Sequence, residues 1–494
     1  MRPALPISLL GWCSACALGA LAPNPAAAAD PPARPNIFLF MVDDMGWMDS
    51  TVYGSEYYRT PNMERLRERS LMFTNAYAAN PLCTPTRGSI LTGQYPGRMN
   101  LTAASGHVGA NPEAPPIAAS GPASNPVVTP TARNQLALEY YTVAEALRDS
   151  GYDTAFFGKW HLGSPSEYWP EHQGFNLNVG GAGNPGPPSY FSPYGLNNLP
   201  NGPVGEHITD RMTNEVISYL EGRAGAEEPY MVFLWHWAVH APFQGVGSLM
   251  EDYRSITDPR GLQDCPTMGA MLESMDTSLG QIMDHLDATG GWNNTVFVFY
   301  SDNGGNMYDT VVDPVTQDAT TPTNNAPLSD GKGHIKEGGV RVPCIISWPG
   351  VIAPGTTTGE VISSIDWYPT FLELAGGALA PGQIVDGMSL VDLLQDGTPL
   401  GREAIFTHVP HYVPATGNLP STAVRAGDWK MYRIYGEGPG LTNVFELYNL
   451  ATDIGETNNV AGSNPALVQQ LDALITQHLA ETGSVVPFPN PAFS

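Results

Sequence analysis

The chain is poor in charged residues, and above all in basic ones. Only 14% of its 494 residues are charged, and 22 Lys and Arg stand against 48 Asp and Glu. An ordinary soluble domain has roughly 25% charged residues. The net charge of −26 argues against a nucleic-acid-binding protein, because such proteins neutralise phosphates with basic side chains. An acidic protein of this kind can hold hard cations on its carboxylates.

Long apolar runs are also scarce. Beyond the N-terminal segment, no stretch reaches the ~18 uninterrupted apolar residues of a membrane-spanning helix. Residues 1–29 read as a signal peptide, with Arg2, an apolar stretch and the small residues 26–29 as a cleavage site. Prolines and a glycine within the segment disfavour an uncleaved anchor, and the bulky Trp12 disfavours lipoprotein processing at Cys13. We expect a periplasmic or secreted protein without stable membrane insertion.

Cysteine is rare as well. The chain has five, of which Cys13 and Cys16 fall in the predicted signal peptide, so that Cys83, Cys265 and Cys344 remain. Three is an odd number for an exported protein, so at most two can form a disulfide and one must have another role. The sequence leaves open whether Cys265 and Cys344 pair.

What the chain does contain predicts a folded α/β protein. Its 53 Gly and 46 Pro indicate numerous loops, whereas 42% hydrophobic residues and ten Trp exclude a disordered chain. Apolar runs with strand character alternate with helical patterns and indicate an α/β sandwich with a mostly parallel sheet. The expected strands are 36–42, 154–157, 230–235, 295–300 and 345–348. We expect one helix to begin at Thr60-Pro61, a second at Thr142, and a third to span residues 268–286. Residues 103–132 are expected to form a surface loop.

The pattern changes near residue 400. Residues 423–426 and 429–432 flank Gly427-Asp428 and predict a hairpin, followed by a strand at 446–448 and a helix over 464–481. We therefore predict a large N-terminal domain over residues 30–400 and a smaller, antiparallel α+β subdomain over residues 401–494.

Oxygen-bearing side chains follow two of the predicted strands. Asp43-Asp44 ends the first strand, and Asp302-Asn303 ends a later one. Ligands of parallel α/β sheets bind outside the carboxyl ends of the strands, and such oxygens suit a hard divalent cation. Either pair alone is more often a helix cap or a turn.

A further motif is more specific. Cys83-Thr84-Pro85-Thr86-Arg87, followed by Thr92-Gly93, resembles the maturation motif of the type I sulfatases, in which the cysteine is oxidised to formylglycine. This would explain the odd cysteine. Other segments resemble the family's blocks in the same order: Arg34-Pro35-Asn36, Asp43-Asp44-Met45-Gly46, Gly158-Lys159-Trp160-His161-Leu162-Gly163, His236-Trp237-Ala238-Val239-His240-Ala241-Pro242, Ser301-Asp302-Asn303-Gly304-Gly305, Gly331-Lys332-Gly333, Glu337-Gly338-Gly339-Val340-Arg341-Val342-Pro343, and Tyr448-Asn449-Leu450 with Asp453.

The resemblance implies an alkaline-phosphatase-like α/β/α sandwich with a C-terminal antiparallel sheet, and a role for each matching residue. A formylglycine-generating enzyme would convert Cys83. One calcium ion would be bound by Asp43, Asp44, Asp302, Asn303 and the converted Cys83. Arg87 and Lys159 would hold the hydrated aldehyde, His161 would contact one of its hydroxyls, and His240 and Lys332 would bind the sulfate.

The chemistry implied is hydrolysis of sulfate esters, including aryl sulfates. One hydroxyl of the hydrated aldehyde attacks sulfur, and His240 or Lys332 protonates the leaving oxygen. The second hydroxyl then loses its proton to His161, and sulfate is expelled as the aldehyde forms again. The cations reduce the negative charge on sulfate that makes it a poor electrophile.

Exported members of the family commonly act on carbohydrates, so we expect a sulfated carbohydrate substrate. Loops around Tyr190, His408 and His411 could stack on a sugar, and His236 is a weaker alternative to His240. One rival hypothesis is a related phosphoester or phosphonate hydrolase. Another is a non-catalytic carbohydrate-binding relative, which the intact motifs disfavour.

Overall fold

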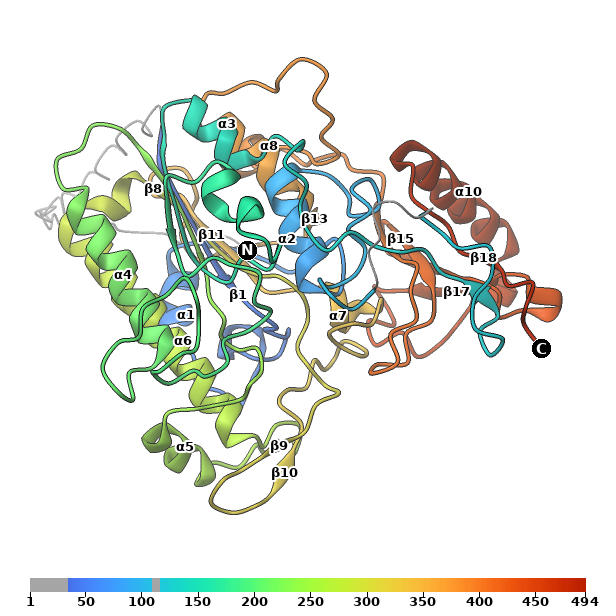
Figure 1. Ribbon diagram of the computed structural model, residues 1–494, viewed down its shortest axis with the longest axis horizontal. Coiled ribbons are helices and arrows are strands. Elements are labelled where there is room, and N and C mark those ends of the chain that lie inside the picture. The colour runs from blue at the N-terminus through green and yellow to red at the C-terminus, as the bar shows by residue number, and fades with distance from the viewer. Residues whose placement is uncertain (1–33, 109–115) are drawn as a thin grey trace, which may run out of the picture. The chain divides into compact units, whose positions relative to one another are not determined.

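The computed structural model describes residues 34–108 and 116–494, so the predicted signal peptide lies outside the described residues. An eight-stranded sheet organises the larger part of the chain (Figure 1). In spatial order its strands are β12 (Thr356–Thr358), β2 (Leu71–Phe73), β11 (Cys344–Ser347), β8 (Thr295–Ser301), β1 (Asn36–Val42), β7 (Tyr230–Trp235), β5 (Asp153–Gly158) and β6 (Leu177–Val179).

Helices cover both faces of this sheet because its strands are apolar on both sides. Every residue of β1 is buried; Ile37, Leu39 and Met41 pack on one face, and Phe38 and Phe40 on the other. Such continuous apolar strands are typical of a sheet covered on two sides. The first face carries α2 (Cys83–Thr92), α3 (Val143–Asp149), α8 (Trp367–Leu374) and α9 (Val391–Asp396); the second carries α1 (Pro61–Glu68), α4 (Ile208–Gly222), α5 (Gly247–Arg254) and α6 (Pro266–Thr289).

The sheet is mixed, with its parallel core at the centre. β8, β1, β7, β5 and β6 run parallel, whereas β11 runs antiparallel to both β8 and β2. The strand expected at 345–348 forms as β11 and runs antiparallel to β8. Within residues 34–108 and 116–494, three two-stranded pairs lie outside this sheet: β9 (Val311–Val312) with β10 (Ala319–Thr320), β3 (Ala76–Tyr77) with β13 (Ile362–Ser363), and β4 (Val127–Val128) with β18 (Phe488–Pro489).

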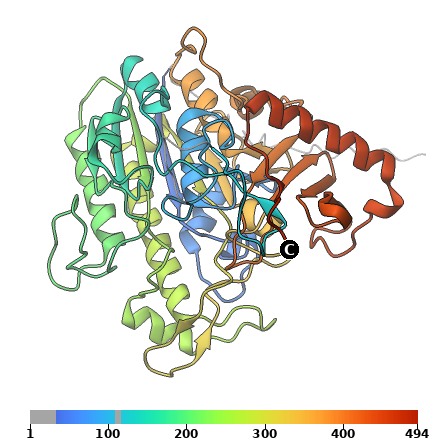
Figure 2. The same ribbon diagram turned by 45° about the vertical axis from the view of Figure 1, so that its right-hand side comes forward.

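A second, antiparallel sheet occupies the C-terminal part of the chain (Figure 2). Val424, Met431 and Leu447 of this sheet pack against one face of the last helix, α10 (Pro465–Thr482). The hairpin at Gly427-Asp428 is confirmed, since Ala426 pairs with Trp429. The strands of this second sheet are β14 (Ile405–Val409), β15 (Ser421–Ala426), β16 (Trp429–Ile434) and β17 (Val444–Asn449). The boundary proposed at residue 400 falls just before β14.

Two local predictions need correction. The segment 103–132 is not wholly a surface loop, because it contributes β4, which pairs with β18 near the C-terminus. Thr60 precedes α1 as expected, but its hydroxyl accepts a hydrogen bond from Thr51 N instead of capping the helix. By contrast, the capping box of Thr142 and Glu145 forms at the start of α3.

The remaining cysteines are free thiols. Cys83, Cys265 and Cys344 are all buried and unpaired, so Cys265 and Cys344 form no disulfide with each other. Within the described ranges, no helix is both long and apolar enough to cross a bilayer.

Candidate active site

The site begins where the two central strands of the sheet end. β1 and β8 are parallel neighbours in register, with Val42 opposite Ser301. The next residues on each strand, Asp43 and Asp302, therefore emerge at the same edge of the sheet. Asp44 follows with a left-handed φ of 60°, and its backbone N–H donates to Asp302 Oδ1 at 3.2 Å.

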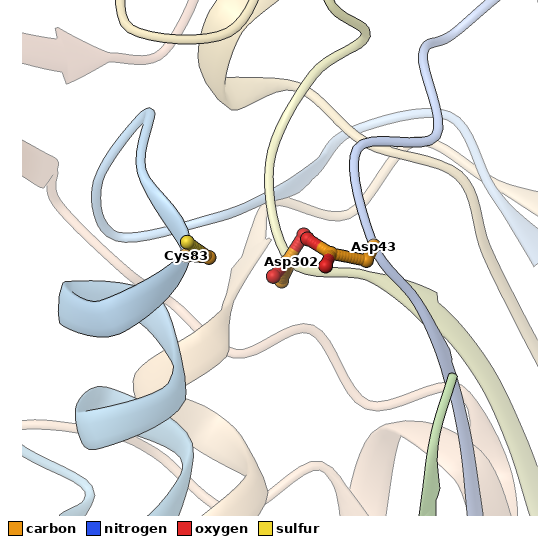
Figure 3. Close-up of side chains that lie close together, drawn as sticks. All are labelled: Asp43, Cys83 and Asp302. Carbon is orange, nitrogen blue, oxygen red and sulfur yellow. The ribbon is translucent and has the colours of Figure 1, made fainter. Parts of the chain in front are cut away.

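Helix α2 brings Cys83 to this edge as its first residue. One ligand atom each of Asp43, Cys83 and Asp302 lies within 4.8 Å of the others, and all three residues are buried. Figure 3 shows the two carboxylates close together with Cys83 at the N-terminal end of the helix. The strand ends predict that the two carboxylates meet, and the resemblance of the Cys83 motif implies that the cysteine joins them.

Three buried cations neutralise the three carboxylates. Arg87, one helical turn after Cys83, donates from Nε and Nη2 to Asp302 Oδ2 at 2.9 and 2.7 Å. Lys159 Nζ follows β5 and donates to Asp43 Oδ2 at 2.5 Å. Lys332 Nζ donates to Asp44 Oδ2 at 2.7 Å. None of the six side chains is more than 7% exposed.

Burial shapes the protonation of this cluster. Burial, reinforced by the neighbouring Asp302 charge, raises the pKa of Asp43. Burial also favours the neutral form of Asp44, but the charges of Lys332, His240 and Lys159 together outweigh burial and lower the pKa of that carboxyl. Burial raises the pKa of the Cys83 thiol, with Lys159 and Lys332 acting in the opposite direction.

The polar oxygens of the site fit a divalent metal ion. Asp43 Oδ1 and Asn303 Oδ1 are buried and have no hydrogen-bond partner in the part of the chain that the structure describes. Unsatisfied buried oxygens are uncommon, and each one calls for an explanation such as an ion. Together with Asp44 and Asp302 they form a set of oxygen donors, which suits calcium or magnesium better than zinc.

Two histidines face the same centre. His161 Nδ1 lies 3.3 Å from Cys83 Sγ, and burial together with the Lys159 and Arg87 charges holds the pKa of His161 well below its ordinary value. His240 Nδ1 donates to Ala241 O at 2.7 Å, which leaves Nε2 facing Asp44 Oδ2 at 3.8 Å. Burial and the Lys332 charge hold the pKa of His240 well below its ordinary value too. Both imidazoles are therefore neutral near pH 7.

Comparison with known proteins identifies the family. Residues 35–378 match the family described as Sulfatase, and residues 330–483 match N-sulphoglucosamine sulphohydrolase, C-terminal. A sulfatase of Formosa agariphila is 31% identical, over 88% of this chain and 85% of the relative. The chain belongs to the sulfatase family. It is thus a sulfuric ester hydrolase, and the predicted alkaline-phosphatase-like fold is confirmed.

Other relatives of this sulfatase act on or bind sugars. The N-acetylgalactosamine-6-sulfatase of Mus musculus is 28% identical, over 88% of this chain and 78% of its own. Ps i-CgsB, of which there is a crystal structure in complex with k-i-k-neocarrahexaose, is 25% identical in sequence to this chain. The superposition covers 90% of this chain and 92% of that chain, with a TM-score of 0.72.

Four of the predicted substrate-contacting residues of the sulfatase are buried within the fold. His236 Nε2 contacts Ser278 Oγ at 3.0 Å, His408 contacts Thr422 Oγ1 at 2.8 Å, and His411 contacts Thr102 Oγ1 at 2.8 Å. These histidines and Tyr190 are each at most 5% exposed. Because all four side chains are buried, the structure supports neither a sugar-stacking role for Tyr190, His408 and His411 nor His236 as the alternative to His240.

Two contacts at the site escape sequence reasoning. The Tyr190 hydroxyl lies 2.6 Å from Trp237 O and 2.8 Å from His240 O, and so holds the turn that carries His240. Thr84, at a position of the motif where any residue is allowed, donates from Oγ1 to His161 O at 3.1 Å. The sequence predicts that Tyr190 contacts the substrate, and it predicts no role for Thr84. Neither contact has a local sequence signal, because the partners lie far away in the chain.

Proposed function

We propose that this sulfatase is an exported, calcium-dependent enzyme that desulfates carbohydrates through a formylglycine made from Cys83. The observation that carries the proposal is the position of Cys83. The cysteine of a maturation motif begins a buried helix, within 4.8 Å of two carboxylates and beside buried cations. A buried structural cysteine needs no such surroundings.

Asp43, Asp44, Asp302 and Asn303 would hold the calcium ion, which draws negative charge from the sulfate oxygens when bound. Hydrated formylglycine supplies two hydroxyl groups on one carbon, one to attack sulfur and one to let sulfate leave. A formylglycine-generating enzyme is the partner that this maturation requires.

The chain's own residues divide the remaining work. Lys159 and Arg87 place positive charge beside residue 83 and form ion pairs with the carboxylates of Asp43 and Asp302, respectively. His161 is neutral and 3.3 Å from Cys83 Sγ, so its Nδ1 can take a proton from a group at that position. His240 Nε2 and Lys332 Nζ both lie near Asp44. The Lys332 ammonium can bind sulfate and protonate the leaving oxygen, whereas the neutral His240 has its N–H on Nδ1 and presents an unprotonated Nε2 beside it.

The choice of a carbohydrate rests on the relatives. An N-acetylgalactosamine-6-sulfatase and a protein crystallised with a neocarrahexaose share most of their length with this chain. A sulfated galactan or a glycosaminoglycan fragment is therefore the substrate class we propose, with aryl sulfates as surrogate substrates. Export rests on residues 1–29, which carry the sequence pattern of a signal peptide.

The decisive experiment compares protein made with and without a co-expressed formylglycine-generating enzyme. We expect p-nitrophenyl sulfate hydrolysis only from the sample whose residue-83 peptide has, by mass spectrometry, lost its thiol. Full activity from protein that retains the Cys83 thiol would contradict the mechanism.

Parallel assays define the reaction and the metal. The modified enzyme should hydrolyse p-nitrophenyl sulfate well above p-nitrophenyl phosphate and phenylphosphonate, and should release sulfate from sulfated galactan or glycosaminoglycan oligosaccharides. A phosphonate preference would favour the rival hydrolase. Chelation should abolish activity and calcium should restore it, whereas activity after verified removal of all metal would contradict the calcium site.

A further inference from the structure

Lys332 lies on a loop that is held against the site at several points. We call residues 329–337 the Lys332 loop. Lys332 N donates to Gly305 O at 2.9 Å, two residues after Asn303, and Gly333 N donates to Pro81 O at 2.8 Å, two residues before Cys83. The backbone of the loop thus bridges the metal-binding strand end and the start of α2.

Glu456 links the first and last residues of this loop. Glu456 Oε2 accepts hydrogen bonds from Ser329 Oγ at one end of the loop and from Glu337 N, 2.9 Å away, at the other. Glu456 lies beyond β17 in the C-terminal part of the chain and is only 4% exposed. A single buried carboxylate therefore ties the two ends of the loop together.

Lys430, on β16, completes this closure. Its Nζ donates to Glu337 Oε1 at 2.7 Å and lies 3.8 Å from Glu456 Oε1, which also accepts a hydrogen bond from Tyr432. Lys430 is 3% exposed and Glu337 is fully buried. Helix α7 (Glu337–Val340), which begins at the end of the loop, accordingly lies beside the C-terminal sheet in Figure 1.

The C-terminal part also holds the middle of the loop. Thr416 Oγ1 donates to Gly333 O at 3.1 Å, and Asn418 Oδ1 accepts from Ile335 N at 3.0 Å. The neighbours of Lys332 are thus held from outside the large sheet, whereas its ammonium is held at Asp44 within the site.

We propose that Lys430 and Glu456 are positioning residues that set the place of the Lys332 ammonium in the site. The inference rests on the proposed function, in which Lys332 faces the leaving oxygen. It gives the C-terminal subdomain a part in the reaction although neither side chain contacts the substrate. Small misplacements of a reacting group are costly, with losses of about 100-fold for a shift of about 1 Å.

The leaving group of the substrate distinguishes positioning from general stability. p-Nitrophenolate is a stable anion that needs little help from a proton donor, whereas the phenolate released from phenyl sulfate needs more. A displaced Lys332 must therefore slow phenyl sulfate more than p-nitrophenyl sulfate. A merely destabilised enzyme loses the same fraction of active molecules for both substrates.

The test measures kcat and KM of the calcium-loaded, formylglycine-containing full chain on substituted phenyl sulfates. For Lys430→Met we expect kcat to fall about tenfold or more on phenyl sulfate and less than about threefold on p-nitrophenyl sulfate. Lys332→Met provides the reference for complete loss of the ammonium. Glu456→Gln should shift the leaving-group dependence in the same direction, and it carries the test if Lys430→Met does not fold.

Arg433→Met is the matched control. Arg433 is a buried cation on the same strand, but it binds Asp472 of α10 instead of the loop. Its loss should lower the melting temperature without changing the leaving-group dependence. If kcat fell by the same factor on all substrates in Lys430→Met and Glu456→Gln, the inference would be overturned while the proposed function would stand. The same holds if Lys332→Met showed no dependence on the leaving group. A wild-type enzyme that hydrolyses no sulfate would overturn the proposed function and this inference with it.

Discussion

Replacing Lys159 by methionine separates the charge balance of the site from its catalytic power. Lys159 Nζ and Asp43 Oδ2 are 2.5 Å apart, and both side chains are fully buried. Without a metal ion, the carboxylates of Asp43, Asp44 and Asp302 are formally balanced by Arg87, Lys159 and Lys332. Lys159→Met removes the cation that is paired with Asp43, so calcium becomes the charge that favours the ionised form of this buried carboxyl.

The structure sets the size of two opposite effects. Removing one partner of a buried ion pair costs about 3–5 kcal/mol, so the metal-free variant should be clearly less stable than the wild type. Two unit charges about 5 Å apart interact by about 3 kcal/mol at an effective permittivity of about 20, and calcium carries two. Allowing for lost preorganisation of Asp43, we expect calcium to bind at least about tenfold more tightly, or about 1.4 kcal/mol.

The measurement needs no activity. Isothermal titration calorimetry gives the calcium Kd, and melting curves with chelator and with calcium give the stabilisation by the ion. In chelator, the variant should melt at a lower temperature than the wild type. Added calcium should raise the melting temperature of the variant more than that of the wild type, and the variant should hydrolyse sulfate esters poorly. Arg254→Met, which removes a cation paired with Asp313 outside the site, should leave the calcium Kd unchanged. Calcium binding that is equal or weaker in Lys159→Met would refute the charge-balance reasoning.

Three further predictions concern single residues. Cys83→Ser, made where serine is not oxidised, presents one hydroxyl instead of two and should give at most one slow turnover and a stable sulfated serine, detected by mass; sustained turnover would exclude the elimination step. Arg87→Lys loses the double contact with Asp302 and should destabilise the chelated protein by about 3 kcal/mol in denaturant unfolding. Burial raises the pKa of Asp49 from 3.8 to about 7, so the fold keeps a proton that the unfolded chain releases; stability should fall between these pH values by about 1.4 kcal/mol per unit. Asp49→Asn should flatten that decline in melting temperature, and an unchanged slope would count against a raised pKa.

The core of the site could be predicted because it depends on short-range patterns. The apolar run of β1 followed by Asp43-Asp44, and that of β8 followed by Asp302-Asn303, predict two strand ends at one edge of a parallel sheet. The structure brings these ends together. The spacing of Cys83 and Arg87 likewise places both on one side of the first turn of α2.

The residues that escaped prediction act through distant partners. Lys430 pairs with Glu337, which is 93 positions away in the sequence, and nothing in the pattern of β16 indicates this. Burial of His408 and His411 is equally invisible, because the covering residues, such as Val485 and Thr102, lie far away in the sequence. The direction of β11 was also beyond the sequence, since a short apolar run looks the same parallel or antiparallel.

Two of the many glycines lie where backbone segments of the site pack directly on each other. A Cβ on Gly304, the residue after Asn303, would lie 1.7 Å from Gly338 O, and one on Gly339 would lie 1.9 Å from His334 O. The backbone after the metal-binding strand end therefore packs directly on the backbone that closes the Lys332 loop, and Gly304 N donates to Gly339 O at 2.9 Å. Any side chain at Gly304 would push these segments apart and move Lys332 away from Asp44. These glycines thus belong to the geometry of the site as much as the charged residues do.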